Sequence, residues 1–253
     1  MALGGCSSGG SGSGHSPQTT EALRQIKLAA HTSRSVRTLT ASLAVESAGG
    51  TVGNLTGTIA IQLRPSKLIG AHFNLKSGTQ RVHLDEILTS NAIYFKDPSF
   101  TKAAGKPWVK ASFSELSAKS GVNLGALLQN LEGSNPLDQT LLFTSSKDVH
   151  EVGTQTVNGV ATTEYAGTYS PEKAYRSLSP ALRKQLGTML RNIGTHSVRF
   201  RVWIDGQHLI RKVANTESVR GQTVTTNLLV TSVNEPIGIK LPNPSQTAAM
   251  PKS

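Results

Sequence analysis

The sequence contains a single cysteine, Cys6, among its 253 residues. One thiol forms neither a disulfide within the chain nor a cysteine-based zinc site, so packing alone must hold the fold together. A chain of this length can bury a hydrophobic core without such support. No stretch approaches 18 consecutive apolar residues, the length that a membrane-spanning helix needs. The sequence therefore predicts one globular domain, and its many Ser, Thr and Gly residues favour strands and turns.

Motifs that carry catalysis are also missing. None of the seven histidines stands four residues from another, and the chain from residue 19 onward has no Gly-x-Ser-x-Gly elbow, phosphate-binding loop or dinucleotide fingerprint. We therefore expect no enzymatic activity, no metal site and no cofactor. Asp85 and Glu86 are a candidate acid/base pair. Adjacent residues of a strand point to opposite faces, however, which favours a turn or a solvated edge instead.

Positive charge exceeds negative charge, and the excess is uneven. The formal net charge is +11; residues 1–169 contribute +3 (14 basic, 11 acidic) and residues 170–253 contribute +8 (12 basic, 4 acidic). A basic surface attracts anionic lipid, anionic wall polymer or nucleic acid. Nucleic-acid binding is not expected, because the aromatic residues are not interleaved with the basic ones. A solvated basic face that keeps the protein in solution is the simpler interpretation.

The residues around Cys6 are the sharpest local signal. Leu3, Gly4 and Gly5 precede the cysteine as in a bacterial lipobox, in which the thiol receives a diacylglyceryl group. Ten of the twelve residues from Gly5 to Ser16 are Gly or Ser, a composition that forms a flexible tether; ten such residues reach roughly 17–19 Å. Acyl chains such as palmitate on Cys6 would anchor the domain. Because a signal peptide needs a charged and an apolar region before the cysteine, the alternative is a cloning remnant or a misassigned start.

Hydrophobic periodicity predicts a single α+β domain with about eight to eleven antiparallel strands and no repeat. We expect a tether at residues 1–18, the domain at 19–241 and a flexible, proline-containing tail at 242–253. A helix is predicted at 19–30, a second near 124–131, and helical turns from 171 to 193, where Ser170 and Pro171 form a helix start. Alternation predicts strands at 36–45, 55–63, 69–75, 80–87, 92–96, 108–111, 196–204, 209–219 and 222–233.

Four segments resemble the actinobacterial LppX/LprA/LprF/LprG lipoproteins. They are residues 106–110 (KPWVK), 151–160 (EVGTQTVNGV), 163–168 (TEYAGT) and 202–212 (VWIDGQHLIRK), and the lipobox precedes them in the same order as in that family. The family is similar to the LolA/LolB carriers. The resemblance implies a strongly curved antiparallel sheet, or half-barrel, whose concave face is covered by helices around a hydrophobic cavity for acyl chains.

The resemblance implies a monomeric, non-catalytic lipoprotein on the extracytoplasmic face of the cell membrane, which carries or presents a lipid or glycolipid. The alternative is a membrane-tethered regulator of the same fold that binds an envelope signalling protein. Trp108, Tyr165 and Trp203 are either ligand contacts or core anchors, and Arg211 and Lys212 either meet an anionic headgroup or face water. From the strand alternation we expect these residues to line or adjoin the cavity: Ile59, Ile61, Phe73, Leu75, Val82, Leu84, Ile93, Phe95 and Val109.

Overall fold

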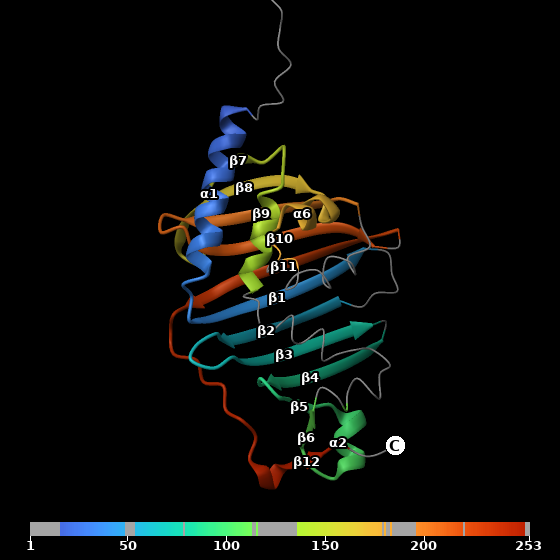
Figure 1. Cartoon of the computed structure of the whole chain (residues 1–253). Helices are drawn as coiled ribbons and strands as arrows, with labels where there is room; N and C mark the ends of the chain where they lie inside the picture. Colours follow the sequence, from blue (N-terminus) through green and yellow to red (C-terminus); the bar gives the residue numbers. More distant parts are fainter. Residues whose placement is uncertain are drawn as a thin grey trace, which may run out of the picture.

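A computed structural model describes residues 16–48, 54–77, 79–112, 136–178, 196–219 and 221–250, together with the single residues 115, 180 and 183. In these ranges twelve strands form one sheet, in the order β12-β6-β5-β4-β3-β2-β1-β11-β10-β9-β8-β7 (Figure 1). Neighbouring strands are antiparallel, except that β12 and β6 are parallel. The strands are β1 (Thr38–Ala48), β2 (Asn54–Gln62), β3 (Leu68–Ser77), β4 (Gln80–Leu88), β5 (Ala92–Lys96), β6 (Trp108–Ser112), β7 (His150–Val157), β8 (Val160–Tyr169), β9 (Val198–Asp205), β10 (Ile210–Val219), β11 (Gln222–Val233) and β12 (Thr247–Ala249).

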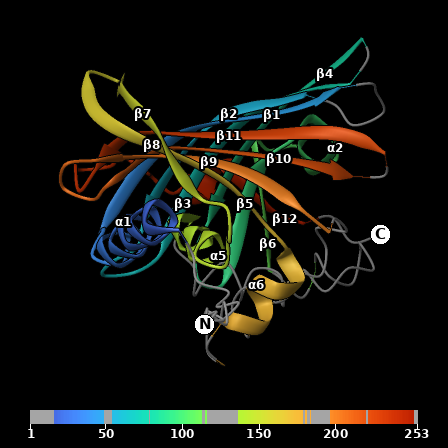
Figure 2. The same ribbon diagram turned by 90° about the horizontal axis from the view of Figure 1, so that it is seen from above.

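The sheet is strongly curved and is not closed into a barrel, because β7 and β12 are its two free edges. Figure 2 shows the sheet bending around α1 (Pro17–Ser33) and α5 (Thr140–Phe143), which lie on its concave side. We call this side the inner face. The expected α+β class and curved half-barrel are therefore confirmed.

The N-terminal helix starts two residues earlier than predicted, because residues 16–18, which were expected in the tether, form its cap and first turn. Ser16 is the N-cap, and its hydroxyl accepts a hydrogen bond from the amide of Thr19 at 3.1 Å, while Pro17 occupies the first turn. Such a cap satisfies an amide that has no partner within the helix. The helix is one turn longer than expected, and its buried side, which includes Ala22, Ile26 and Ala29, faces the sheet.

The main hydrophobic core lies between these helices and the inner face. The Phe143 ring of α5 stacks on Phe200 of β9, with ring centroids 4.2 Å apart and planes 3° apart. Around this stack lie residues of β1, β8, β10 and β11, among them Leu39, Val213 and Leu228. A second, smaller cluster at the other end of the sheet contains Phe95, Val109, Ala111 and Met250.

Short polar turns join the hairpins at the β7 end of the sheet. Asn158 and Gly159 connect β7 to β8 with φ angles of 48° and 77°, which is the left-handed pair that a two-residue hairpin turn requires. The next helix, α6 (Pro171–Ser177), begins at the predicted N-cap Ser170, whose hydroxyl accepts from the amide of Lys173.

The structure differs from the sequence prediction at several places. Residues 242–250 do not form a loose tail: the 3₁₀ turn η2 (Pro244–Gln246) leads into β12, and the amide of Met250 donates to the carbonyl of Lys110. Backbone pairing with β6 orders this segment despite its prolines, and β12 becomes the twelfth strand and the edge of the sheet. The helices α2 (Pro98–Ala104), η1 (Pro136–Gln139) and α5 were not predicted, because they are too short to show a helical period.

Several predictions fall on residues outside the described ranges. These are the tether with Cys6, the helix near 124–131, most of the helical region after residue 180, and residues 251–253. In the part of the chain that the structure describes, no helix has the length and apolar character needed to cross a membrane.

Candidate functional site

Strand register brings the nine predicted cavity residues onto one face of β2 to β6. Phe73 lies opposite Gly57 and Leu84, and Leu75 lies opposite Leu55 and Val82. Residues directly opposite each other share a face of the sheet, and so do alternate residues along one strand. By this rule the same face also carries Ile59 and Ile61 on β2, Ile93 and Phe95 on β5, and Val109 on β6. Ile59 and Ile61 pack with the main core, which identifies this face as the inner one.

The nine residues differ in how far they are buried. Ile61, Phe95 and Val109 are 4, 7 and 0% exposed and belong to the two cores. Ile59 and Ile93 are half-buried and pack against those cores. The other four are half-buried and belong to neither cluster of described residues. Together with Leu55, which the sequence analysis did not select although it alternates with Ile59, they form what we call the inner apolar strip: Leu55, Phe73, Leu75, Val82 and Leu84.

A carboxylate interrupts the apolar character of the inner face. Glu86 lies opposite Ala71 on β3 and Phe95 on β5. Burial raises the pKa of the Glu86 carboxyl, and the nearby charge of Asp97 raises it further. Its neighbour Asp85 lies on the other face, where its carboxylate contacts Nδ1 of His72 at 2.8 Å. The carboxylates of Asp85 and Glu86 point to opposite faces, as their adjacent positions predict. They lie within β4 and not in a turn, and of the two only Asp85 lies on the outer face.

A row of polar side chains adjoins the inner apolar strip. On β10, Asn215 and Glu217 follow the core residue Val213 at alternate positions and therefore share its face. Asn215 lies opposite Phe200 and Thr226, and Glu217 lies opposite Val198 and Val224. We call Ser47, Asn215, Glu217 and Thr226 the inner polar strip.

Two oxygen atoms of the inner polar strip are buried and have no hydrogen-bond partner among the described residues. They are Oδ1 of Asn215 and Oε2 of Glu217. Burial raises the pKa of Glu217, and the pKa of Tyr169 is raised by burial and by the charge of Glu217. Leaving a buried acceptor unpaired costs about 1–3 kcal/mol, so two such atoms on one face need an explanation. These two residues were not predicted as site residues, although two polar residues at alternate positions after the apolar Val213 are a signal for them.

The other candidate residues have structural roles. Tyr165 is 6% exposed within the main core. Trp203 lies on the outer face, where Lys212 and Arg201 cover its ring at 4.4 and 5.3 Å from the centroid. Trp203 is therefore an anchor of the outer face and not a contact of the inner one. Trp108 is half-buried at the β6 edge, and it lies opposite Thr247 of β12.

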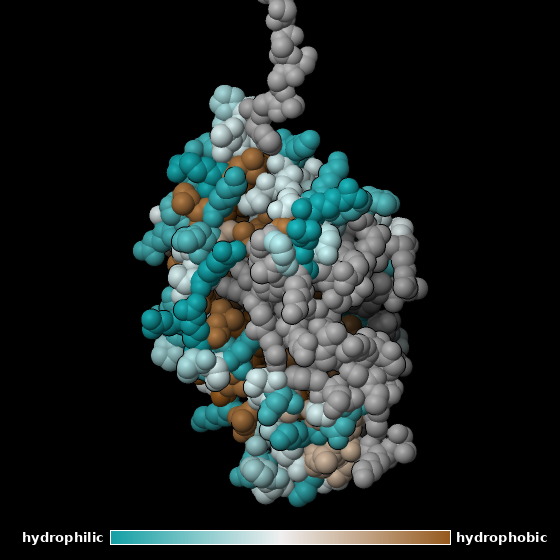
Figure 3. Space-filling view, viewed as in Figure 1, coloured by the Kyte–Doolittle hydropathy of each residue, from teal (hydrophilic) through white to brown (hydrophobic). Residues whose placement is uncertain are grey.

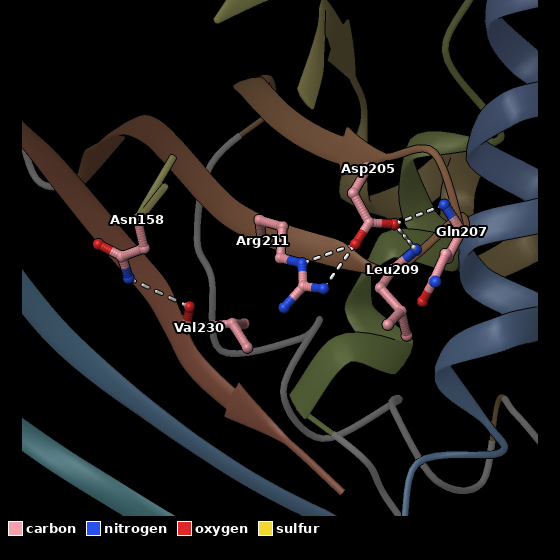
Figure 4. A network of polar contacts seen from close by, with 6 residues as sticks. All are labelled: Asn158, Asp205, Gln207, Leu209, Arg211 and Val230. Atoms are coloured by element: carbon pink, nitrogen blue, oxygen red, sulfur yellow. Dashed lines mark hydrogen bonds and ion pairs between the residues drawn. The ribbon is translucent and has the colours of Figure 1, made fainter. Parts of the chain in front are cut away.

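Arg211 is held by an ion pair with Asp205. The Asp205 carboxylate accepts hydrogen bonds from Nε and Nη2 of Arg211 at 2.7 and 2.6 Å, and from the amides of Gln207 and Leu209 at 2.8 and 2.9 Å (Figure 4). This network closes the β9–β10 turn. The predicted Asp205-Gly206 hairpin is thus confirmed. The guanidinium of Arg211 binds the Asp205 carboxylate of this turn and is not a contact for a lipid headgroup.

The described outer surface offers little apolar area. Figure 3 shows mainly hydrophilic residues on the side that carries α1, with hydrophobic residues in small separate patches. Among the described residues, Val152 and Leu241 are the exposed large hydrophobic side chains, each 51% exposed. No group of three or more His, Cys, Asp or Glu residues in the described ranges could hold a metal ion.

Comparison with solved structures agrees with this geometry. The crystal structure of LprF from Mycobacterium bovis superposes with a TM-score of 0.56 at 14% identity, covering 91% of this chain and 98% of that one. The lipoprotein LppX of Mycobacterium tuberculosis gives a TM-score of 0.52 at 15% identity, covering 87% and 99%. The chain has the fold of the LppX/LprF-type lipoproteins. The resemblance found in the sequence is thereby confirmed at the level of the fold.

Sequence comparison adds one relative. An uncharacterised 31.2 kDa protein of Streptomyces griseus, from the rplA–rplJ intergenic region, is 25% identical over 169 residues. The match covers 62% of this chain and 54% of that protein, so the chain spans about half the length of this relative. No protein-family model matches the sequence.

Proposed function

We propose that the protein is a cell-envelope lipoprotein that binds the acyl chains of a lipid or glycolipid on its inner face and carries or presents them without catalysis. The observation that carries this proposal is the inner apolar strip, where five large apolar side chains lie half-buried on the concave face outside both cores. Covering such side chains with acyl chains is favourable by about 25 cal/mol per Å² of apolar surface.

The anchor and the location belong to the same proposal. The lipobox-like residues before Cys6 and the Gly/Ser tether support acylation of the cysteine, which would hold the domain at the extracytoplasmic face of the cell membrane. The helix α1 starts directly after this tether, so the folded domain would stand close to the lipid surface. The net charge of +11 supports attraction to anionic envelope material.

Native mass spectrometry of protein purified from a lipid-producing actinobacterial host tests the proposal. We expect adducts with the mass of acylated lipids on the wild-type chain. Leu75→Gln should reduce them about tenfold or more, because the amide would lie unpaired among acyl chains. Lys76→Gln changes the adjacent, outward-pointing and exposed residue of β3 and should leave the adducts unchanged. A ligand-free mass for the wild-type protein would overturn the proposal.

A further inference from the structure

The inner apolar and polar strips are parts of one continuous surface. A single cross-strand row runs from Asn215 on β10 through Thr226 and Val45 to Leu55, Leu75 and Val82 on β4. Five strand spacings separate its ends, which is about 24 Å along the sheet. The row is polar at Asn215 and Thr226 and apolar from Val45 onward. Its two ends therefore suit the two ends of an amphipathic molecule.

The polar end presents acceptors that no group in the described part of the chain satisfies. Oδ1 of Asn215 and Oε2 of Glu217 are both buried and unpartnered, and their residues stand two apart on the same face of β10, about 7 Å along the strand. The Ser47 hydroxyl of the same strip donates to Oε1 of Gln222 at 3.3 Å and not to either of these oxygens. Both atoms are hydrogen-bond acceptors, so a molecule that satisfies them must supply donors.

Building on the proposed function, we propose that Asn215 and Glu217 accept hydrogen bonds from free hydroxyl groups of the bound lipid. The ligand class is then a lipid that keeps at least one unesterified hydroxyl, with its acyl chains on the inner apolar strip. A fully esterified lipid offers only acceptors to these two oxygens and leaves both of them unpaired. The two residues would thus select among lipids that share the same acyl chains.

The unpartnered buried nitrogen of Trp203 supplies a matched control. Its Nε1 also lacks a partner, but the residue lies on the outer face, opposite Lys212 and Glu164. If the unpaired buried atoms had no role in ligand binding, substitutions of Trp203 and of Asn215 would change the affinity for a lipid equally. If the two acceptors bind a hydroxyl, only the inner-face changes will matter.

The test compares two probes that differ at one oxygen, 1,2-dipalmitoylglycerol and its 3-O-acetyl derivative, titrated into the delipidated full chain and measured by native mass spectrometry. We expect the wild-type protein to prefer the free hydroxyl about tenfold, the effect of one or two hydrogen bonds. The preference should vanish in the double variant Asn215→Leu/Glu217→Met and survive in Trp203→Phe. Glu217→Gln, which keeps an acceptor oxygen, should retain part of it.

The outcomes separate this inference from the proposed function. If wild-type protein binds both probes equally, the acceptors hold water only, and the hydroxyl selection is wrong while acyl-chain binding stands. If the preference persists in the double variant, the assignment to Asn215 and Glu217 is wrong. If neither probe binds the wild-type chain while acylated lipids co-purify with it, the hydroxyl selection is wrong and acyl-chain binding stands; if no lipid co-purifies either, the proposed function fails and this inference fails with it.

Discussion

The side chain of Phe73 lies across the Cα of Gly57, its partner on the neighbouring strand of the inner face. A Cβ added at Gly57 would stand 2.2 Å from the carbonyl oxygen of His72 and 2.6 Å from Cδ1 of Phe73. The absence of a side chain at Gly57 is therefore what lets the Phe73 ring approach β2 this closely while β2 and β3 remain paired.

Gly57→Ala should accordingly destabilise the domain by about 1–3 kcal/mol, the usual cost of overpacking. Because the nearest atom is a backbone oxygen, trimming the ring in Gly57→Ala/Phe73→Ala should not restore stability. Urea unfolding followed by circular dichroism measures both effects. Gly206→Ala is the control, since an added Cβ there meets no atom within 4 Å; equal stability of the two single variants would contradict the close approach.

Glu86 should make the domain less stable as the pH rises above about 5. Burial and Asp97 raise the pKa of Glu86 in the folded state above its usual value of 4.5, so the folded chain binds the proton more tightly than the unfolded chain. This contribution to stability is complete below pH 4.5 and is lost as the pH rises through the folded pKa. Glu86→Gln should therefore flatten the pH dependence and be the more stable protein at pH 7.

Urea unfolding between pH 4 and pH 8 checks this sign. Glu46→Gln, which removes one negative charge from an exposed carboxylate of β1, is the control for the change in net charge. The prediction is contradicted if the wild-type protein becomes more stable between pH 5 and 7 and Glu86→Gln removes that increase. That result would mean that the folded site stabilises the charged form of Glu86.

Removal of the Asp205 carboxylate should cost about 3–5 kcal/mol, because it leaves Arg211 buried without its partner and two turn amides without an acceptor. The side chains of Asp205 and Arg211 are 4 and 19% exposed. The exposed pair of Arg176 and Glu172, 75 and 69% exposed, gives the comparison: Glu172→Ala should cost at most about 1 kcal/mol. Chemical denaturation of Asp205→Ala and Glu172→Ala measures the difference, and comparable losses would contradict the assigned role of the network.

Cys6→Ala in the full-length precursor should release the protein from membranes, because the thiol that receives the acyl chains is absent. Fractionation of the native host into membrane and soluble material, followed by immunodetection, measures the release. Ser7→Ala changes the next residue without removing the thiol and should leave the protein with the membranes. Unchanged fractionation of Cys6→Ala would refute the anchor.

Alternation predicted the strands of the inner face closely. Residues such as Ile59, Phe73 and Leu84 were assigned to one side of the sheet from spacing alone, and the register places them there, because a strand repeats every two residues. Burial could not be predicted in the same way. Val109 is fully buried whereas Leu75 is half-buried, and this depends on whether another segment, such as β12 with Met250, packs over the position.

By itself, then, the sequence determined the α+β class, the period of most strands, the capped start of α6 at Ser170 and the position of the lone Cys6. Tertiary structure decided which face became the interior and which polar groups it contains. Leu43 lies opposite Leu228, and through that pairing of distant segments the β10–β11 hairpin joins the first strands of the chain. Only this long-range register places Asn215 and Glu217 beside the inner apolar strip. Local sequence patterns do not fix the pairing of strands that are remote in the chain, because that pairing depends on the packing of the whole sheet.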